Sequence, residues 1–191
     1  MTDFKQDLSI PKVFISDASG EVFLNCKVCN RDLMSGDIPY SVEKAKRKMP
    51  DKGPDITLFE IAVCMHCAQK QAQKMSKASR LFMEQTLVSE KSKHKKQAMW
   101  DGNWQESWDK QCFYDENPIQ DNEEYHVVGQ FLGGQILNGF PPFVIGYDML
   151  EYINENLSAE TKEELDDFGN KYLGTDPKLA LLLKDTRVLI V

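Results

Sequence analysis

The sequence predicts an α+β protein, and three observations carry this prediction. Short runs of β-branched and aromatic residues, typical of strands, recur in both halves of the 191-residue chain. Segments rich in helix formers follow them, with apolar residues three or four positions apart. Two C-x-x-C pairs, Cys26 with Cys29 and Cys64 with Cys67, interrupt the first half. We expect a β-hairpin and helix stapled by these cysteines, followed by a C-terminal hairpin with two or three helices.

The first half alternates strand patterns with turns and then changes to a helix. Residues 12–26 predict a hairpin that turns around Asp17–Gly20. Residues 38–48 and 56–63 predict two further strands, separated by a loop that contains prolines and a glycine. One long helix is expected from about Met65 to near Val88, because its apolar residues follow a 3.6-residue period.

The middle of the chain is the least regular part. The charged segment 89–97 is expected to be exposed. All three tryptophans, Trp100, Trp104 and Trp108, follow at a spacing of four. This spacing would line one helical face, but the intervening Asp-Gly-Asn sequence breaks helices readily. A short helix and a loop held by its aromatic side chains both fit residues 100–124.

The second hairpin is expected at residues 124–140, with a two-residue turn at Gly133–Gly134. Such a turn places Phe131 opposite Ile136 and Val127 opposite Phe140, which gives the hairpin one apolar face.

Two helices are then predicted. Leu150, Ile153 and Leu157 form the apolar stripe of the first. Ser158 caps the second, which stops at Gly174. A capping aspartate before proline at Asp176–Pro177 starts a short third helix. Residues 187–191 close the chain as an apolar strand.

Charged residues are distributed unevenly along the chain. Residues 1–100 hold 17 Lys and Arg against 12 Asp and Glu, whereas residues 101–191 hold 6 against 18. We therefore expect a zinc-binding unit with a long basic helix at 1–98, a Trp-rich acidic connector at 99–124, and an α+β unit at 125–191. The opposite charges of the two halves could attract one another, and the two units could share one core.

The two cysteine pairs predict a metal site. Each C-x-x-C turn presents two thiolates, and four thiolates form the closed tetrahedral set that structural zinc accepts at about 2.3 Å per sulfur. We expect one structural Zn(II) per chain, bound by Cys26, Cys29, Cys64 and Cys67. Iron fits the same four sulfurs. A thioredoxin-like redox pair is a weaker alternative, because no βαβ pattern surrounds the cysteines. His66 lies between two ligands but is not needed as a fifth.

The predicted order of elements resembles the treble-clef class of zinc fingers. A C-x-x-C turn, or knuckle, is followed by strands and then by a helix with the last two ligands in its first turn. The resemblance covers about residues 22–90 and implies a zinc-stapled fold. The sequence departs from that pattern in two ways. The 34 residues between Cys29 and Cys64 exceed the usual spacing, and Asn30 and Ala68 stand where a glycine often follows each pair.

Two surfaces are candidate binding sites. The basic segment 69–96 could contact nucleic-acid phosphates, although a solvated helix face explains the same charges. The residues singled out are Lys70, Lys74, Lys77, Arg80, Lys93, Lys95 and Lys96. The three tryptophans could dock a protein partner, because tryptophan is enriched at interface hot spots. Tryptophans that anchor the segment on its own domain are the alternative.

No residue pattern predicts an active site. A Cys112–His126 dyad is conceivable, but a buried bystander thiol is the simpler interpretation. The glycines of the second hairpin match neither a phosphate loop nor a dinucleotide motif. We expect a non-enzymatic structural-zinc protein that acts as an interaction or regulatory module with a protein partner. Nucleic-acid binding is the alternative, and an enzyme with a cleft between the two halves is the second alternative. The first ten residues lack a secretory pattern, and no apolar run spans a membrane, so a cytoplasmic location is expected.

Overall fold

The structure is a computed structural model that describes residues 9–50, 53–102, 105, 108–121 and 123–173. Within these ranges the chain forms a mixed α/β fold with one antiparallel sheet, five α-helices and a short 3-10 helix. The elements in chain order are η1 Lys12–Phe14, β1 Tyr40–Arg47, β2 Ile56–Cys64, α1 Met65–Lys74, α2 Lys77–Leu87, α3 Glu90–Asp101, β3 Glu124–Leu132, β4 Gln135–Ile136, β5 Phe143–Ile145, α4 Tyr147–Asn156 and α5 Ala159–Tyr172. None of the helices in these ranges has the length and apolar character that crossing a bilayer requires.

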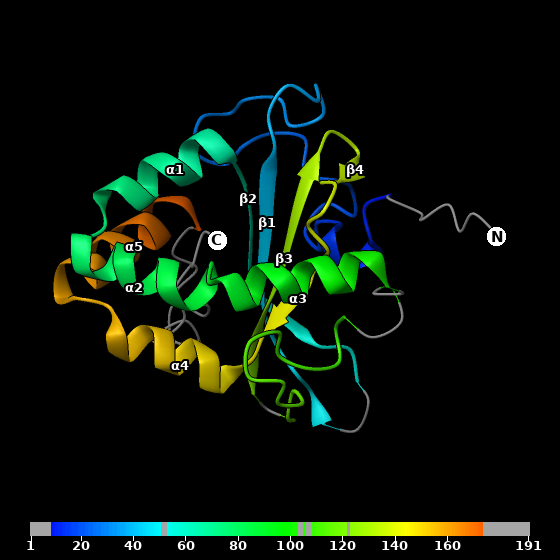
Figure 1. Cartoon of the computed structure of the whole chain (residues 1–191). Helices are drawn as coiled ribbons and strands as arrows, with labels where there is room; N and C mark the ends of the chain where they lie inside the picture. The colour runs from blue at the N-terminus through cyan, green and yellow to red at the C-terminus, as the bar shows by residue number, and fades with distance from the viewer. Residues whose placement is uncertain (1–8, 51–52, 103–104, 106–107, 122, 174–191) are drawn as a thin grey trace.

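The sheet joins strands from both halves of the sequence. Its order is β2-β1-β3-β4, and β5 pairs with β3 on the same edge as β4. Strand β1 lies at the centre, where Tyr40 faces Cys64 of β2 on one side and Phe131 of β3 on the other. Figure 1 shows β1 and β3 side by side along most of their length. The segments 1–98 and 125–191 therefore contribute to one sheet. The boundaries expected at 98 and 124 stay predictions.

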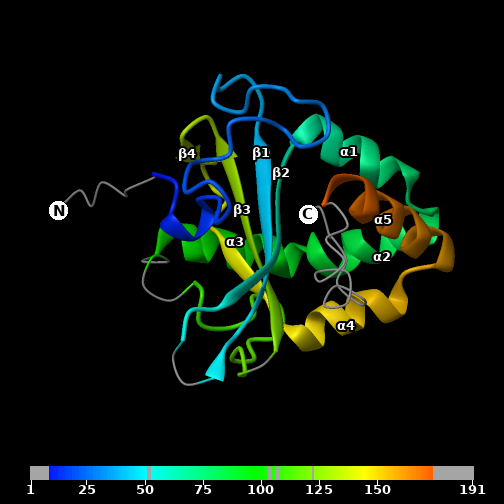
Figure 2. The same ribbon diagram turned by 180° about the vertical axis from the view of Figure 1, so that it is seen from behind.

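The two faces of the sheet are covered by different parts of the chain. Helix α3 crosses one face (Figure 1), and Val128 of β3 joins the apolar cluster that includes Met149 and Ile153 of α4. The N-terminal segment lies on the other face (Figure 2), where Phe14 packs edge-on against Phe131 with ring centroids 5.1 Å apart. Both faces of the central strands are therefore buried, which explains why β1 is buried almost throughout.

A buried lysine fastens the N-terminal segment to the sheet. Lys44 of β1 has no exposed side-chain surface, and its Nζ lies 2.9 Å from a Glu60 carboxylate oxygen and 3.2 Å from one of Asp17. Lys44 also donates to the carbonyl of Ile15. The hydroxyl of Ser16 donates to Glu60 at 2.6 Å. A buried charge is tolerated only when it is paired and hydrogen-bonded, and this cluster meets that requirement.

The predicted long helix from Met65 to Val88 is wrong, because the chain breaks it in the middle. Helix α1 ends at Lys74, and α2 begins after Ser76. The Ser76 side chain accepts a hydrogen bond from the backbone N–H of Ser79 at 3.1 Å, which is an N-cap. The apolar period continues across this break, so periodicity alone could not locate it.

The second hairpin is partly as predicted. The two-glycine turn forms, and Phe131 faces Ile136. The predicted pairing of Val127 with Phe140 is wrong, because Val127 faces Val144 of β5. Strand β4 has only two residues, and the two prolines after Phe140 have no N–H to continue a ladder.

Two other expectations differ from the structure. Residues 12–26 contain the 3-10 helix η1 and then a turn, which the N–H of Ser16 closes by donating to the carbonyl of Glu21 at 2.9 Å, and no strand pair flanks this turn. The segment expected to be exposed at 89–97 lies mostly in α3, and its lysines differ in exposure, because Lys93 is exposed whereas Lys95 and Lys96 are half-buried.

The two C-terminal helices are confirmed. The Ser158 hydroxyl oxygen accepts from the N–H of Thr161 at 3.2 Å and so caps α5, which ends at Tyr172. The predicted stop at Gly174, the third helix at Asp176–Pro177 and the closing strand lie outside the described residues.

Candidate metal centre

The first cysteine pair lies in a tight turn between the N-terminal segment and β1. The N–H of Cys26 donates to the carbonyl of Arg31, and the N–H of Asn30 donates to the carbonyl of Cys26, both at 2.8 Å. Asn30 has a φ of 58°, a left-handed conformation that asparagine adopts more readily than most residues. Asn30 therefore occupies the position where a glycine often follows such a pair.

The second pair lies where β2 becomes α1. Cys64 is the last residue of β2 and the N-cap residue of α1, and Cys67 lies in the first turn of that helix. The partial positive charge of a helix N-terminus favours thiolate over thiol. The predicted position of the second pair, where a strand becomes a helix, is confirmed.

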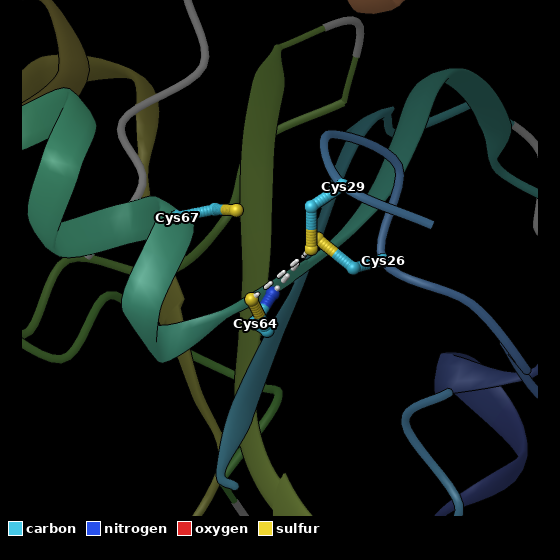
Figure 3. Close-up of side chains that lie close together, drawn as sticks. All are labelled: Cys26, Cys29, Cys64 and Cys67. Atoms are coloured by element: carbon cyan, nitrogen blue, oxygen red, sulfur yellow. Dashed lines mark hydrogen bonds between the residues drawn. The ribbon is translucent and has the colours of Figure 1, made fainter. Parts of the chain in front are cut away.

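The four sulfurs converge on one point. The Sγ atoms of Cys26, Cys29, Cys64 and Cys67 all lie within 4.8 Å of one another, and those of Cys29 and Cys64 are 3.8 Å apart. In Figure 3 the first pair approaches from a loop and the second from the β2–α1 junction. Four sulfurs placed tetrahedrally at about 2.3 Å from zinc would be separated by about 3.8 Å. The cluster has the size of a four-thiolate metal site and could hold a metal ion.

The long separation of the pairs in sequence follows from the β1–β2 hairpin. The chain leaves the first pair, runs out along β1 and returns along β2, and the last residue of β2, Cys64, faces Tyr40 at the start of β1. Further hydrogen bonds hold the same end of the hairpin, because the N–H of Lys27 donates to the Ala62 carbonyl at 2.9 Å and the N–H of Met65 to that of Pro39 at 2.8 Å.

The thiols of the cluster differ in acidity. Burial raises the pKa of Cys29, but hydrogen bonds from the Arg31 backbone and from the neighbouring thiols lower it to about 7. Burial raises the pKa of Cys64 and of Cys67, and the charge of Cys26 raises both further. A negative charge on one cysteine therefore disfavours deprotonation of the neighbouring thiols. A bound divalent cation would offset this repulsion, and a coordinating thiol is deprotonated by its metal.

The cluster is enclosed on most sides. Cys26, Cys64 and Cys67 are buried, whereas Cys29 is exposed. The N–H of Cys64 donates to Cys26 Sγ at 3.3 Å, and such donors offset the charge of a thiolate. His66 is exposed on α1 and does not belong to the cluster. Four sulfur ligands fill a tetrahedral metal, so this arrangement suits a structural ion with no open position for a substrate.

No protein family, curated protein or solved structure matches this chain in comparisons with known proteins. The interpretation of the metal centre therefore depends on its geometry alone.

The predicted basic set is distributed over three helices. Lys70 and Lys74 lie on α1, Lys77 and Arg80 on α2, and Lys93, Lys95 and Lys96 on α3. Three of these lysines pair with carboxylates of the same chain: Lys74 with Glu164 at 2.6 Å, Lys93 with Glu90 at 2.7 Å, and Lys95 with Glu116 at 2.9 Å. Nucleic-acid binding by this set stays a prediction.

Two of the three tryptophans pack against the protein itself. Trp100 and Trp108 are partly buried against the core of the sheet. The Trp108 ring stacks on Phe14 with centroids 5.8 Å apart. Trp104 lies outside the described residues. A partner that docks on this segment stays a prediction.

The conceivable Cys112–His126 dyad does not match the contacts of the histidine. Both ring nitrogens of His126 contact carboxylates, Nδ1 at 2.8 Å from Glu43 and Nε2 at 3.2 Å from Glu124. Cys112 is fully buried, and burial raises the pKa of its thiol. The buried carboxylate–imidazole–carboxylate group was missed in the sequence, because strand alternation predicts which residues share a face but not which face is covered.

One cavity of about 230 Å³ lies beside the start of α4. Its lining includes the carboxylates of Asp115, Glu123 and Asp148 but neither a cysteine nor a histidine. The Asp148 carboxylate accepts a hydrogen bond from the Asn117 side chain at 3.3 Å. A nucleophile paired with a base is therefore not among the described residues that line it.

Proposed function

We propose that this chain is a non-enzymatic zinc protein in which Cys26, Cys29, Cys64 and Cys67 bind one structural Zn(II). The observation that carries the proposal is the convergence of four sulfurs within 4.8 Å from two segments far apart in the sequence. The order of knuckle, hairpin and helix, with Cys64 and Cys67 at the helix start, supports the resemblance to treble-clef zinc fingers.

The metal would act as a scaffold for the first half of the chain. Structural zinc sites contribute on the order of 10–16 kcal/mol of apparent binding free energy, which is comparable with the stability of a whole domain. Backbone hydrogen bonds already shape the loop that carries Cys26 and Cys29, because the bridge between Asn25 and Asp32 closes it and the N–H of Lys27 donates to Ala62 of β2. Zinc would add two metal bonds from this loop and two from the β2–α1 junction, and so would fix the loop more firmly against β2.

We propose that the fixed loop and its surroundings form an interaction or regulatory surface for a protein partner. Leu24, two residues before the first ligand, is 57% exposed, and exposed large apolar side chains mark interaction sites when they gather in a patch. A scaffold that orders a loop with one exposed leucine among polar side chains suits recognition better than catalysis, because a closed four-sulfur site offers no position for a substrate.

Hydrogen exchange tests the scaffold role. Backbone amides around Cys26–Cys29 and in the first turn of α1 should exchange slowly in the zinc-loaded protein and at least tenfold faster after a strong chelator removes the metal. The amides of α4, whose Met149 and Ile153 belong to the other apolar cluster, serve as the internal reference and should change much less. Equal protection of the knuckle with and without zinc would contradict the proposal.

A further inference from the structure

Lys96 places its ammonium group against two buried aromatic rings. Its Nζ lies 4.5 Å from the ring centroid of Phe143 and 5.8 Å from that of Phe113. Both rings belong to the apolar cluster that packs under α4. Attraction between a cation and an aromatic ring favours the ammonium, whereas the partial burial of Lys96, which excludes water on the ring side, opposes it.

Lys96 lies on the face of α3 that packs against the protein interior. Ser92, four residues earlier, is buried, and Met99, three residues later, packs against the apolar clusters. Residues at these spacings share one face of a helix. Lys96 therefore occupies the inward stripe of α3, where an apolar residue is expected.

Two neighbouring lysines on the same helix pair with carboxylates, although Lys95 Nζ also lies 4.9 Å from the ring centroid of Phe113. The Lys93 ammonium lies 2.7 Å from the Glu90 carboxylate, and that of Lys95 lies 2.9 Å from Glu116. No carboxylate pairs with Lys96 in the part of the chain that the structure describes. Burial lowers the pKa of Lys96 to about 8, whereas Glu90 raises the pKa of Lys93. Near neutral pH, Lys96 therefore has a larger share of free amine than Lys93.

We propose that Lys96 is an acylation site, a nucleophilic amine that accepts an acyl group from an acyl thioester. The nitrogen lone pair attacks the thioester carbonyl carbon, and the N–C bond forms as the C–S bond breaks. The sulfur leaves with the bonding electrons and takes up the proton that the nitrogen loses, so an amide and a free thiol result. The amide carries no charge and suits the ring-lined position better than an ammonium. This proposal does not depend on the metal centre.

Site-resolved acetylation tests the proposal with a control inside the same helix. The full-length folded protein is treated at pH 8 with S-acetyl-N-acetylcysteamine, a small acetyl thioester. Cleavage after glutamate and fragmentation mass spectrometry then give separate rates for Lys96 and Lys93. The free-amine fraction of Lys96 exceeds that of an ordinary lysine by about 100-fold at this pH, but a less basic amine is also a weaker nucleophile. We expect Lys96 to react about tenfold faster than Lys93.

Two further measurements test whether the fast reaction of Lys96 comes from its packing in the folded protein or from its local sequence. The rate at Lys96 should level off above pH 8, whereas the rate at Lys93 should continue to rise. In urea-unfolded protein the two rates should become equal, because the rings no longer surround Lys96. The Lys96→Arg variant should lose the fast site. Equal rates at Lys96 and Lys93 in the folded chain, or a fast Lys96 that persists in urea, would overturn the proposal.

Discussion

The backbone N–H of Cys64 donates to the Sγ of Cys26 at 3.3 Å, although 38 positions separate the two residues in sequence. This contact joins the loop of the first cysteine pair to the junction of β2 and α1. Because Cys64 also pairs with Tyr40 in the sheet, the metal centre is continuous with the central strands. Changes at the cluster are therefore expected to affect the folding of the sheet as well as metal binding.

The N-caps of α2 and α5 are coupled to one another. The Ser158 hydroxyl donates to Ser76 Oγ at 2.9 Å, and the N–H of Ser76 donates to Thr161 Oγ1 at 3.0 Å. Replacing Ser76 or Ser158 by alanine should each lower the free energy of unfolding by about 1 kcal/mol. The double variant should lose at least ~0.5 kcal/mol less than the sum, because each change already disrupts the shared network. Urea unfolding of the four proteins measures this coupling.

Ser89 supplies the matched control for this coupling. It caps α3 by accepting from the N–H of Ser92 at 3.3 Å. Ser89→Ala combined with Ser158→Ala should show additive losses. Additive losses for Ser76→Ala with Ser158→Ala as well would show that the two caps act independently, contrary to the expected coupling.

Gly129 of β3 is expected to tolerate no side chain. A Cβ at this position would lie 2.7 Å from Phe131 Cζ and 2.8 Å from Phe14 Cζ, which is closer than van der Waals contact allows. Both rings are buried, so they cannot move into solvent. Gly129→Ala should lower the free energy of unfolding by about 1–3 kcal/mol through overpacking. Gly134→Ala is the control, since open space surrounds that position, and a similar loss in both variants would contradict the packing argument.

His126 predicts a pH dependence of stability. Burial lowers its pKa, but hydrogen bonds to Glu124 and Glu43 and their charges raise it to about 9, above the ordinary value of 6.5. A raised pKa means that the folded state holds the proton more tightly than the unfolded state. This stabilisation is fully present below pH 6.5 and is lost as the pH rises through about 9. We expect a loss on the order of a few kcal/mol across this window.

Comparison with His126→Gln isolates this contribution from other groups that titrate in the same range. Unfolding in urea is measured at several pH values between 6 and 10 on metal-loaded protein, so that the thiols do not titrate. The difference in the free energy of unfolding between the parent and the variant should shrink as the pH rises. A difference that stays constant from pH 6 to pH 10 would show that His126 does not carry a proton in the folded state.

The sequence predicted those parts of the fold that local patterns determine. The strands β1 and β2, the glycine turn that pairs Phe131 with Ile136, and the Ser158 cap all follow from alternation, turn chemistry or capping rules. In each of these cases the signal lies within a few residues. Each C-x-x-C turn is a local signal of the same kind, but the convergence of the two pairs depends on the β1–β2 hairpin that brings them together.

The remaining features depend on contacts between distant segments. The break at Ser76 is stabilised by Thr161 of α5, and the burial of Lys44 depends on Glu60 and on the N-terminal turn. The partial burial of Lys96 depends on rings that come from later in the chain. Such pairings arise from tertiary packing, which overrides local propensity, so composition and periodicity in one sequence could not reveal them.

The metal content of the purified protein tests the central claim most directly. Elemental analysis should give one zinc per chain for the parent protein, and for Cys112→Ala, whose buried thiol lies outside the four-sulfur cluster. Cys64→Ser should bind much less than one zinc and should unfold at a lower urea concentration. A parent protein that is fully folded without metal, or a Cys64→Ser variant that retains its full zinc content, would contradict the account.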